Sequence, residues 1–587
     1  MIVRGAAGCT ASVAAAVVAV GGTVTRPLSL LDGAAATVPG NQLTALRARP
    51  CIVAVTADGS VTLSSTGGYD PTSDAGSMYN TVREIGAPTY WQAGFTGQGV
   101  DVALIDSGVS PVPGLDGGQV VNGPDLSFDS QSATLQSLDA FGHGTHMASI
   151  IAGRDPAAVS TATSRTAFAG VAPDAHIVSV KVADAHGATD ISQVIAGIDW
   201  TVQHAHDDGR NIRVINLSFG TDSVQSYQLD PLAYATEQAW KHGIVVVAAA
   251  GNGGGATASL TNPATDPFVI AVGAADANGT VGTRDDSVAS FSSSGSASRA
   301  PDLVAPGAHI EGLRVPGSYI DTQFGSTATV GGRFFLGSGT SQATAVVSGA
   351  AALIIQQHPS ATPDQVKSLL TTSAQPLASD PRSRQGNGEL SLTAAFSAKL
   401  PKQKLAGQDF APSTGMGTLD AARGSIHLVA NGVALTGEQD IFGNSWSSPA
   451  IANAESSASA WTGGVFNGSG WSGSGWSGSG WSNATWTSNA WSGSGWSGSG
   501  WSGNVWTGSG WSGSGWSGSG WSGSGWSGSG WSGSGWSGSG WSGSGWSGSG
   551  WSGSGWSGSG WSGSGWSGSG WSGSGWSGSG WSSSTWS

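Results

Sequence analysis

Residues 337–355 read GSGTSQATAVVSGAAALII, and this stretch decides how the rest of the chain is interpreted. Its glycine-rich turn presents Ser341 just before a run of small and apolar residues, which predicts a helix that begins near this serine. The first N–H groups of a helix have no partner within it, so they can stabilise a negative charge that develops there. Many serines at this position only cap a helix, so the stretch alone leaves both a capping role and a nucleophile open.

Apolar runs and helical patterns alternate upstream of this stretch, between about residues 79 and 400. The apolar runs predict strands at 100–105, 176–180, 212–217, 244–249 and 268–272, and helices are predicted at 190–204 and 231–242. Near-continuous apolar strands separated by helices predict an α/β fold with a doubly wound, mostly parallel sheet. In such a sheet the residues just after each strand form the ligand-binding edge.

At that edge the sequence places an acid, a base and an amide. Asp106 follows the first strand, His143 begins a small-residue helix, and Asn252 lies in the glycine loop after the strand at 244–249. Each has a structural alternative as a helix cap or turn residue. His143 and His146 also have the spacing of a metal-binding pair, but no nearby Glu or Cys completes a ligand set, so no metal site is assigned.

The motifs VALIDSGV at 102–109, GHGTH at 142–146 and GTS at 339–341 resemble the three signatures of the subtilase (subtilisin-like) serine protease family. The similarity also includes GVAP at 170–173, NLSFG at 216–220, AAGN at 249–252 and PDLVAPG at 301–307. It extends over roughly residues 80 to 400. The resemblance implies a subtilisin-like fold and a serine endopeptidase, a hydrolase that acts through an acyl-enzyme.

Carried over to this chain, the resemblance implies a role for each residue of the constellation. Asp106 orients His143, His143 acts as general base and then general acid, and Ser341 is the nucleophile. The Asn252 side chain and the Ser341 backbone N–H form the oxyanion hole.

Substrate-binding residues follow from the same resemblance. Ser218, Phe219 and Gly220 are expected to pair with an extended polypeptide substrate as an added strand. Together with Ala250 and Gly251 they are expected to wall the primary specificity pocket.

The chain departs from the family pattern just after the serine, at Gln342, Ala345 and Val346, where many subtilases have Met, Pro and His. None of the three transfers the proton, so the departure bears on catalytic efficiency and not on the type of reaction. No cofactor is required by the sequence, and no stretch commits to the structural calcium that is common in the family. We interpret Asp116, Asp125 and Asp129 as solvated loop acids.

Residues 1–66 predict a small ferredoxin-like α+β unit with the order βαββαβ. This unit resembles the inhibitory prodomain of subtilisin-type proteases; the alternative is a signal peptide whose apolar region is 11–20. In a ferredoxin-like sheet the first and last strands are neighbours, and we therefore hypothesise a disulfide between Cys9 and Cys51, against two unrelated thiols. Residues 67–78 have the composition of a linker and are the expected place of processing.

Two further segments follow the catalytic domain, which is assigned to 79–400. Residues 401–445 form an extension, either a hairpin laid on the domain or a small module. Residues 446–587 form a tail with an aromatic residue at every fifth position from Trp461 onward, separated mostly by Gly and Ser. This composition predicts a largely disordered low-complexity chain, and a pentapeptide-period solenoid is the alternative.

Charge separates the tail from the rest, because the net charge of −14 belongs entirely to the first 455 residues. An acidic protein does not suit a nucleic-acid partner, and no apolar run is long enough to span a membrane. We expect polypeptide substrates and an intramolecular prodomain. For the tail we hypothesise cell-wall polysaccharide as a ligand, and an expanded spacer is the alternative. The protein is expected to be secreted or cell-surface associated, although the chain has no clear signal peptide. The competing class is a surface adhesin or scaffold with a decayed protease domain.

Overall fold

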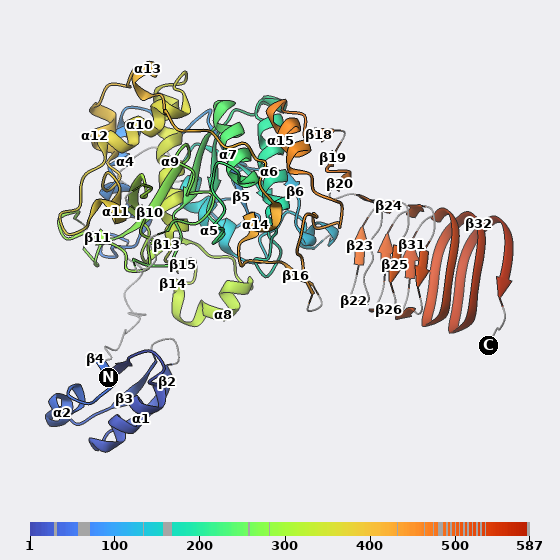
Figure 1. Ribbon diagram of the computed structural model, residues 1–587, viewed down its shortest axis with the longest axis horizontal. Helices are drawn as coiled ribbons and strands as arrows, with labels where there is room; N and C mark the ends of the chain where they lie inside the picture. Colours follow the sequence, from blue (N-terminus) through green and yellow to red (C-terminus); the bar gives the residue numbers. More distant parts are fainter. Residues whose placement is uncertain are drawn as a thin grey trace. The chain divides into compact units, whose positions relative to one another are not determined.

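The computed structural model describes two compact units, Met1–Gly68 and Tyr69–Ser587, which are treated separately (Figure 1). The residues described are 1–28, 32–56, 71–132, 134–156, 167–255, 259–280, 282–296, 298–430, 433–462 and 464–472, together with the backbone of strands between 475 and 583. Four residues of the predicted linker, 67–70, lie outside this set. The rest of that linker forms turns in which Ser77 is buried and donates to the carbonyl of Pro71.

The first unit has the predicted order βαββαβ: β1 (Ile2–Gly5), α1 (Thr10–Ala19), β2 (Thr23–Leu28), β3 (Gly33–Thr37), α2 (Leu43–Arg47) and β4 (Ile52–Thr56). The strands form an antiparallel sheet in the order β2-β3-β1-β4. Val3, Val13, Val17 and Leu46 are fully buried between this sheet and its helices.

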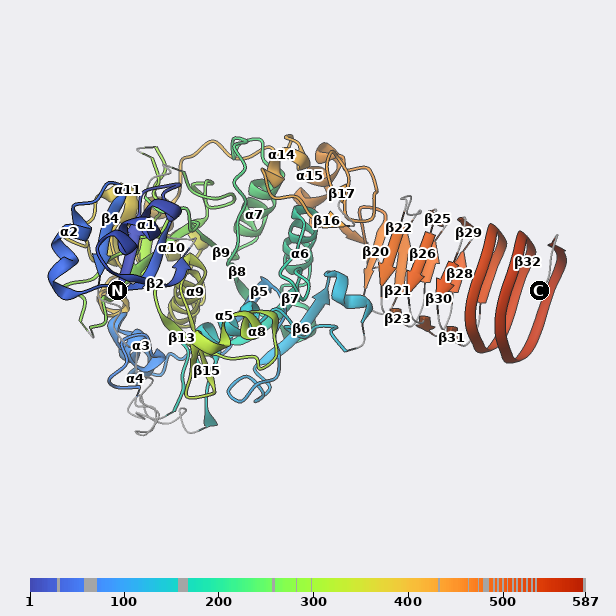
Figure 2. The same ribbon diagram turned by 90° about the horizontal axis from the view of Figure 1, so that it is seen from below.

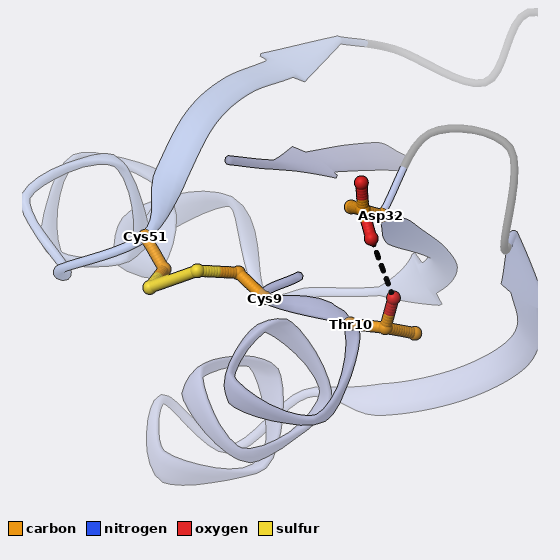
Figure 3. Close-up of a disulfide and its surroundings, with 4 residues drawn as sticks. All are labelled: Cys9, Thr10, Asp32 and Cys51. Atoms are coloured by element: carbon orange, nitrogen blue, oxygen red, sulfur yellow. Dashed lines mark hydrogen bonds between the residues drawn. A yellow bond between two sulfur atoms is a disulfide. The ribbon is translucent and has the colours of Figure 1, made fainter. Parts of the chain in front are cut away.

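A disulfide joins Cys9, just before α1, to Cys51, just before β4, with the two Cα atoms 6.0 Å apart (Figure 3). Because β1 and β4 are antiparallel neighbours, the short segment that follows β1 and the residue before β4 lie at the same end of the sheet. The structure therefore confirms the hypothesis that these two cysteines pair. Thr10 next to the bridge donates to Asp32 over 3.3 Å, as Figure 3 also shows.

The second unit is built on a mostly parallel sheet in the order β11-β10-β9-β8-β5-β7-β6, with β12 also paired to β10. All of the strands and helices predicted in this region are present, with bounds within two residues at their N-terminal ends. The sheet strands are β5 (Asp101–Asp106), β6 (Val120–Asp125), β7 (His176–Lys181), β8 (Ile212–Leu217), β9 (Val245–Ala249), β10 (Ile270–Asp276), β11 (Ser287–Val288) and β12 (Leu303–Pro306). Only the β10–β11 pair is antiparallel among these strands.

Helices surround the sheet and complete the α/β fold (Figures 1 and 2). They are α3 (Met78–Glu84), α4 (Ala87–Gln92), α5 (His143–Ala152), α6 (Ile191–Gln203), α7 (Pro231–Lys241), α8 (Tyr319–Ala328), α9 (Thr340–Gln357), α10 (Pro363–Ser373), α11 (Arg382–Gln385), α12 (Leu392–Ser397), α13 (Gln403–Ala406), α14 (Leu419–Arg423) and α15 (Ser448–Ser456). A second small sheet, β13 (Ile310–Leu313), β14 (Thr329–Val330) and β15 (Phe334–Gly337), precedes α9.

Two pairs of helices cover the sheet. From β5 the chain first reaches β6 at the edge of the sheet and returns through α5 to β7, and it then continues in the same direction through α6 to β8 and through α7 to β9. Helix α9 packs on α5, and α7 packs on α6. Ligands of α/β proteins bind beyond the carboxyl ends of such strands, so the segments after β5, β8 and β9 are the expected place of the site.

The C-terminal extension packs on this unit. Arg423 in α14 is fully buried and forms an ion pair with Asp190, the N-cap of α6, at 2.7 Å. A hairpin follows, formed by β16 (Val429–Ala430) and β17 (Val433–Ala434), as in the first of the two arrangements considered for this segment.

The folded unit also includes the first part of the segment assigned to the tail. Trp446 and Phe466 are buried, and the indole N–H of Trp461, in β18 (Trp461–Thr462), donates to the carbonyl of Ala196 in α6 over 2.8 Å. These aromatic residues have an apolar surface to cover, whereas the later repeats contain only Gly, Ser and Trp for the most part. The repeat segment proper therefore begins beyond this region.

Backbone strands are described in parts of the repeat segment, after β19 (Val465–Phe466), β20 (Ser469–Ser472) and β21 (Gly475–Gly478). From β21 onward they pair in parallel between residues twenty positions apart, as in Trp476↔Trp496 and Trp496↔Trp516. The paired tryptophans are therefore four pentapeptides apart in the sequence (Figure 1). The strands run from β22 (Thr485–Ser488) to β32 (Trp536–Ser583).

Candidate active site

The acid and the base meet at the carboxyl edge of the sheet. Asp106 is the last residue of β5, His143 is the first residue of α5, and the His143 Nδ1 atom lies 2.8 and 3.0 Å from the two carboxylate oxygens of Asp106. Gly144 makes this approach possible, because a Cβ atom there would lie 2.2 Å from the carbonyl oxygen of Gly108. The GHGTH motif is therefore needed for packing as well as for its histidine.

A second carboxylate, Asp139, holds the start of α5 and was missed in the sequence. It is buried and accepts hydrogen bonds from the backbone N–H groups of Gly142 and Thr145 at 2.6 and 2.7 Å. The Ser107 hydroxyl lies 2.9 Å from Asp139 and 3.2 Å from Asp106, and it accepts from the Gly144 N–H. An acid four residues before a helix that begins with histidine is the signal that could have revealed Asp139 as a cap.

The electrostatic setting of His143 favours its protonated form. Burial by itself lowers the pKa of His143, but the charge of Asp106, its hydrogen bond and the charge of Asp139 together outweigh burial and raise that pKa. The imidazole is 26% exposed, so a substrate can reach it.

His146 takes no part in this arrangement. Its ring is buried against the small sheet, with Nε2 2.9 Å from the carbonyl oxygen of Phe335. Burial lowers the pKa of His146 to about 4. Its side chain supports the hairpin that leads to α9.

Ser341 is the second residue of α9, as the helix prediction requires. Its hydroxyl donates to the carbonyl oxygen of Ser218 over 2.8 Å, and the Ser218 hydroxyl lies 3.1 Å from the Ser341 carbonyl. Asn216 at the end of β8 donates to the Ser218 hydroxyl. The start of α9 is thus fastened directly to the loop that follows β8.

Asn252 lies beside the same helix start. Its Oδ1 accepts from the backbone N–H and the hydroxyl of Thr340, at 2.9 and 3.1 Å. The Thr340 hydroxyl also accepts from the N–H of Gly251, so it joins the asparagine loop to the serine turn. A Cβ atom at Gly339 would lie 3.4 Å from Asn252 Nδ2, which shows how closely the amide approaches this turn. Thr340 is the second residue whose importance the motif alone did not reveal.

Gln342, Ala345 and Val346, which replace the residues usual in the family, are buried in α9. The Gln342 amide packs against the turn, since a Cβ atom at Gly337 would lie 2.4 Å from its Nε2. The helix begins in register without a proline, because contacts of Thr340 and Gln342 hold the turn.

The expected substrate-binding residues line the same edge. Phe219 and Gly220 are half-buried and follow β8, and within the described residues their backbone groups make no hydrogen bonds. Ala250 and Gly251 follow β9, where the Ala250 N–H donates to the carbonyl oxygen of Val272 and the Ala250 carbonyl accepts from Thr261. Unpaired backbone groups next to a parallel sheet can accept an added strand.

Two of the three acids interpreted as solvated loop residues are buried. Asp129 forms an ion pair with the buried Lys181 at 2.7 Å, and Asp125 accepts from the hydroxyl of Ser127 at 2.6 Å. Only Asp116 is exposed as expected. The interpretation was wrong for Asp125 and Asp129, because the partners that stabilise them come from residues that the local sequence does not identify.

Comparison with known proteins identifies the family of this chain. The model of the subtilase family matches residues 97–417, and the chain belongs to this family of serine proteases. It is 40% identical to serine protease AprX of Bacillus subtilis over 47% of this chain and 61% of that protein. It is 35% identical to subtilisin of Bacillus pumilus over 50% of this chain and 90% of that protein.

A solved structure of a cold-adapted subtilisin-like serine proteinase also matches, with 31% identity over 51% of this chain and 90% of that one and a TM-score of 0.38. Among the helices that the structure describes, none is long and apolar enough to cross a membrane.

Proposed function

We propose that this chain is a secreted, self-processing serine endopeptidase with Asp106, His143 and Ser341 as its catalytic triad. The observation that carries the proposal is the 2.8 Å contact between His143 and Asp106 at the sheet edge, together with the place of Ser341 in the first turn of α9. Membership of the subtilase family supports the same reaction, hydrolysis of peptide bonds in polypeptide substrates.

The contact between His143 and Asp106 fixes the tautomer of the imidazole. Nδ1–H donates to the carboxylate, which leaves Nε2 unprotonated and able to act as a base. The Ser341 hydroxyl turns from Ser218, transfers its proton to Nε2 and attacks the substrate carbonyl carbon. The imidazolium then protonates the leaving amine, and water releases the acyl group by the same steps in reverse order.

The oxyanion hole is formed by the Asn252 Nδ2 group and the Ser341 N–H. Thr340 holds the Asn252 oxygen, so the amide nitrogen faces the opposite side, where the oxyanion develops. The Ser341 N–H lies in the first turn of α9, where no carbonyl of the helix can accept from it.

Substrate binds along Ser218, Phe219 and Gly220 as an added strand, and Ala250 and Gly251 form a wall of the pocket for the residue before the scissile bond. The unpaired backbone of Phe219 and Gly220 supports this assignment.

Residues 1–66 act as an inhibitory prodomain that is removed by cleavage before the folded turns at 71–77. The Cys9–Cys51 disulfide supports export, because such bridges persist in oxidising compartments. The tail binds cell-wall polysaccharide through its evenly spaced indoles, which can stack on sugar rings.

A direct test compares the chain with Ser341→Ala and with Ser338→Ala, a control in the same turn. The parent and Ser338→Ala are expected to convert to a shorter mature form and to cleave casein. Ser341→Ala should stay full length and lose activity by more than about 10³-fold, because no other group replaces the nucleophile. If the parent also stays full length and does not cleave casein, the proposed function is refuted.

A further inference from the structure

Three carboxyl groups from distant parts of the chain meet away from the triad. They belong to Glu84 at the end of α3, Asp286 just before β11, and Glu389 between α11 and α12. One oxygen from each lies within 4.8 Å of the others. Asp286 and Glu389 are only 4% and 3% exposed, whereas Glu84 is half-buried.

Four of the six oxygens of this cluster have no donor from the residues around it. Both carboxylate oxygens of Asp286, Oε1 of Glu84 and Oε1 of Glu389 are buried without a hydrogen bond. Asp286 is flanked by further acids, since Asp285 and Asp276 also act on its charge. No Lys, Arg or His of the described residues forms an ion pair with the three carboxylates. Buried polar atoms without partners are costly, and buried like charges are more so.

Burial, followed by repulsion from the neighbouring carboxylates, raises the pKa of Glu84 and of Glu389. Burial is also the main cause of the raised pKa of Asp286. The isolated cluster therefore has to retain protons, and a bound cation could replace them.

We propose that Glu84, Asp286 and Glu389 bind a Ca²⁺ ion that links α3 to the loop before β11 and to the segment at Glu389. Calcium binds oxygen ligands at 2.3–2.6 Å, so two oxygens on one ion lie at most about 4.6–5.2 Å apart. The three carboxylates meet this limit. Their all-oxygen chemistry does not suit zinc, which prefers His and Cys.

Mg²⁺ is the closest competitor, and its chemistry differs in a way that can be tested. It requires near-ideal octahedral geometry at about 2.0–2.1 Å and gives up water reluctantly. Ligands on three separate segments favour the larger ion with its more tolerant geometry.

The experiment uses the full chain with Ser341→Ala, which prevents self-digestion, after treatment with a chelator. Ca²⁺ binding is measured by equilibrium dialysis and isothermal titration calorimetry, and thermal unfolding is followed with and without Ca²⁺. The test variant adds Asp286→Asn and Glu389→Gln. The matched control adds Asp199→Asn and Glu455→Gln, which neutralise another pair of buried carboxyls.

The test variant is expected to lose about one Ca²⁺ ion per chain and the accompanying rise in melting temperature, while the control keeps both. Equal stoichiometry in the parent and the test variant, or no Ca²⁺ bound by the parent, overturns the proposal and leaves a cluster that holds only protons. Equal stabilisation by Mg²⁺ at the same concentration overturns the assignment to calcium. If the test variant does not fold, Glu84→Gln at the half-buried position takes its place. The same results then support or overturn the proposal.

Discussion

At the scale of single residues, the site depends on side chains that hold the reacting groups in place. Asp139 fixes the start of α5 through two backbone N–H groups, and Thr340 fixes the Asn252 amide through its oxygen. Neither touches the substrate in the proposed mechanism. Each restricts the direction of a neighbour, which is the main contribution a protein makes to electrostatic catalysis.

Asn252→Ala is expected to lower kcat by about 10²–10³ with little change in KM, because the amide acts on the oxyanion and not on the bound ground state. This magnitude is the one already known for removing an oxyanion donor from subtilisin, and it is applied here by homology. Steady-state kinetics on a chromogenic peptide measure it, with exposed Asn122→Ala on β6 as the control. An unchanged kcat in Asn252→Ala would exclude Asn252 from the oxyanion hole.

At the scale of elements, helix α15 is attached to α6 and α7 through an unusual contact. Asp199 in α6 and Glu455 in α15 are 3% and 2% exposed, and their carboxyl groups interact directly. Tyr234 of α7 faces the same pair. Burial raises the pKa of Asp199, and burial followed by the charge of Asp199 raises the pKa of Glu455.

This pair makes stability depend on pH in a defined direction. The folded protein holds these protons more tightly than the unfolded chain, so stability falls as pH rises from the ordinary carboxyl pKa of about 4 towards the raised values. Each group alone lowers the free energy of unfolding by up to about 1.4 kcal/mol for each pH unit in that range.

The double variant Asp199→Asn, Glu455→Gln is therefore expected to have a flatter profile of unfolding free energy against pH, and to be more stable than its parent at pH 8. At pH 4 the unfolding free energies of the parent and the double variant should differ little. Chemical denaturation of Ser341→Ala protein over this range measures the effect, with the exposed Asp208→Asn as control. Parallel profiles for parent and double variant would show that the pair does not titrate in this way.

At the scale of the whole molecule, charge and composition change abruptly at one boundary. Glu455 is the last charged residue of the chain, and 24 of the 29 tryptophans lie at or after Trp471. Phe466 still packs in the core of the second unit, which places the change of composition within a few residues of it.

Deletion of residues 471–587 is expected to leave peptidase activity unchanged and to reduce binding to cell-wall polysaccharide by a large factor, because the stacking indoles are lost. Co-sedimentation with purified cell walls measures the binding, and a tail with Ala in place of each Trp serves as the matched control. If the deletion variant binds cell walls as strongly as the intact chain, the tail has only a spacer role.

Much of the fold and of the candidate site could be predicted from local sequence patterns, because these patterns depend on residues that are close together in the chain. Apolar runs and helical periodicity predicted the strands and helices of the sheet, and the order of Asp106, His143, Asn252 and Ser341 predicted the site. The βαββαβ order of the first unit even allowed the Cys9–Cys51 pair to be inferred.

Tertiary structure alone decided which charges are buried and which groups accompany them. Asp125 and Asp129 resemble loop acids until Ser127 and Lys181 are seen beside them. The partnership of Asp199 with Glu455, and the meeting of Glu84 with Asp286 and Glu389, join residues far apart in sequence. The physical reason is that the energy of a carboxylate depends on its solvation and its neighbours in space, and neither is encoded in the residues next to it.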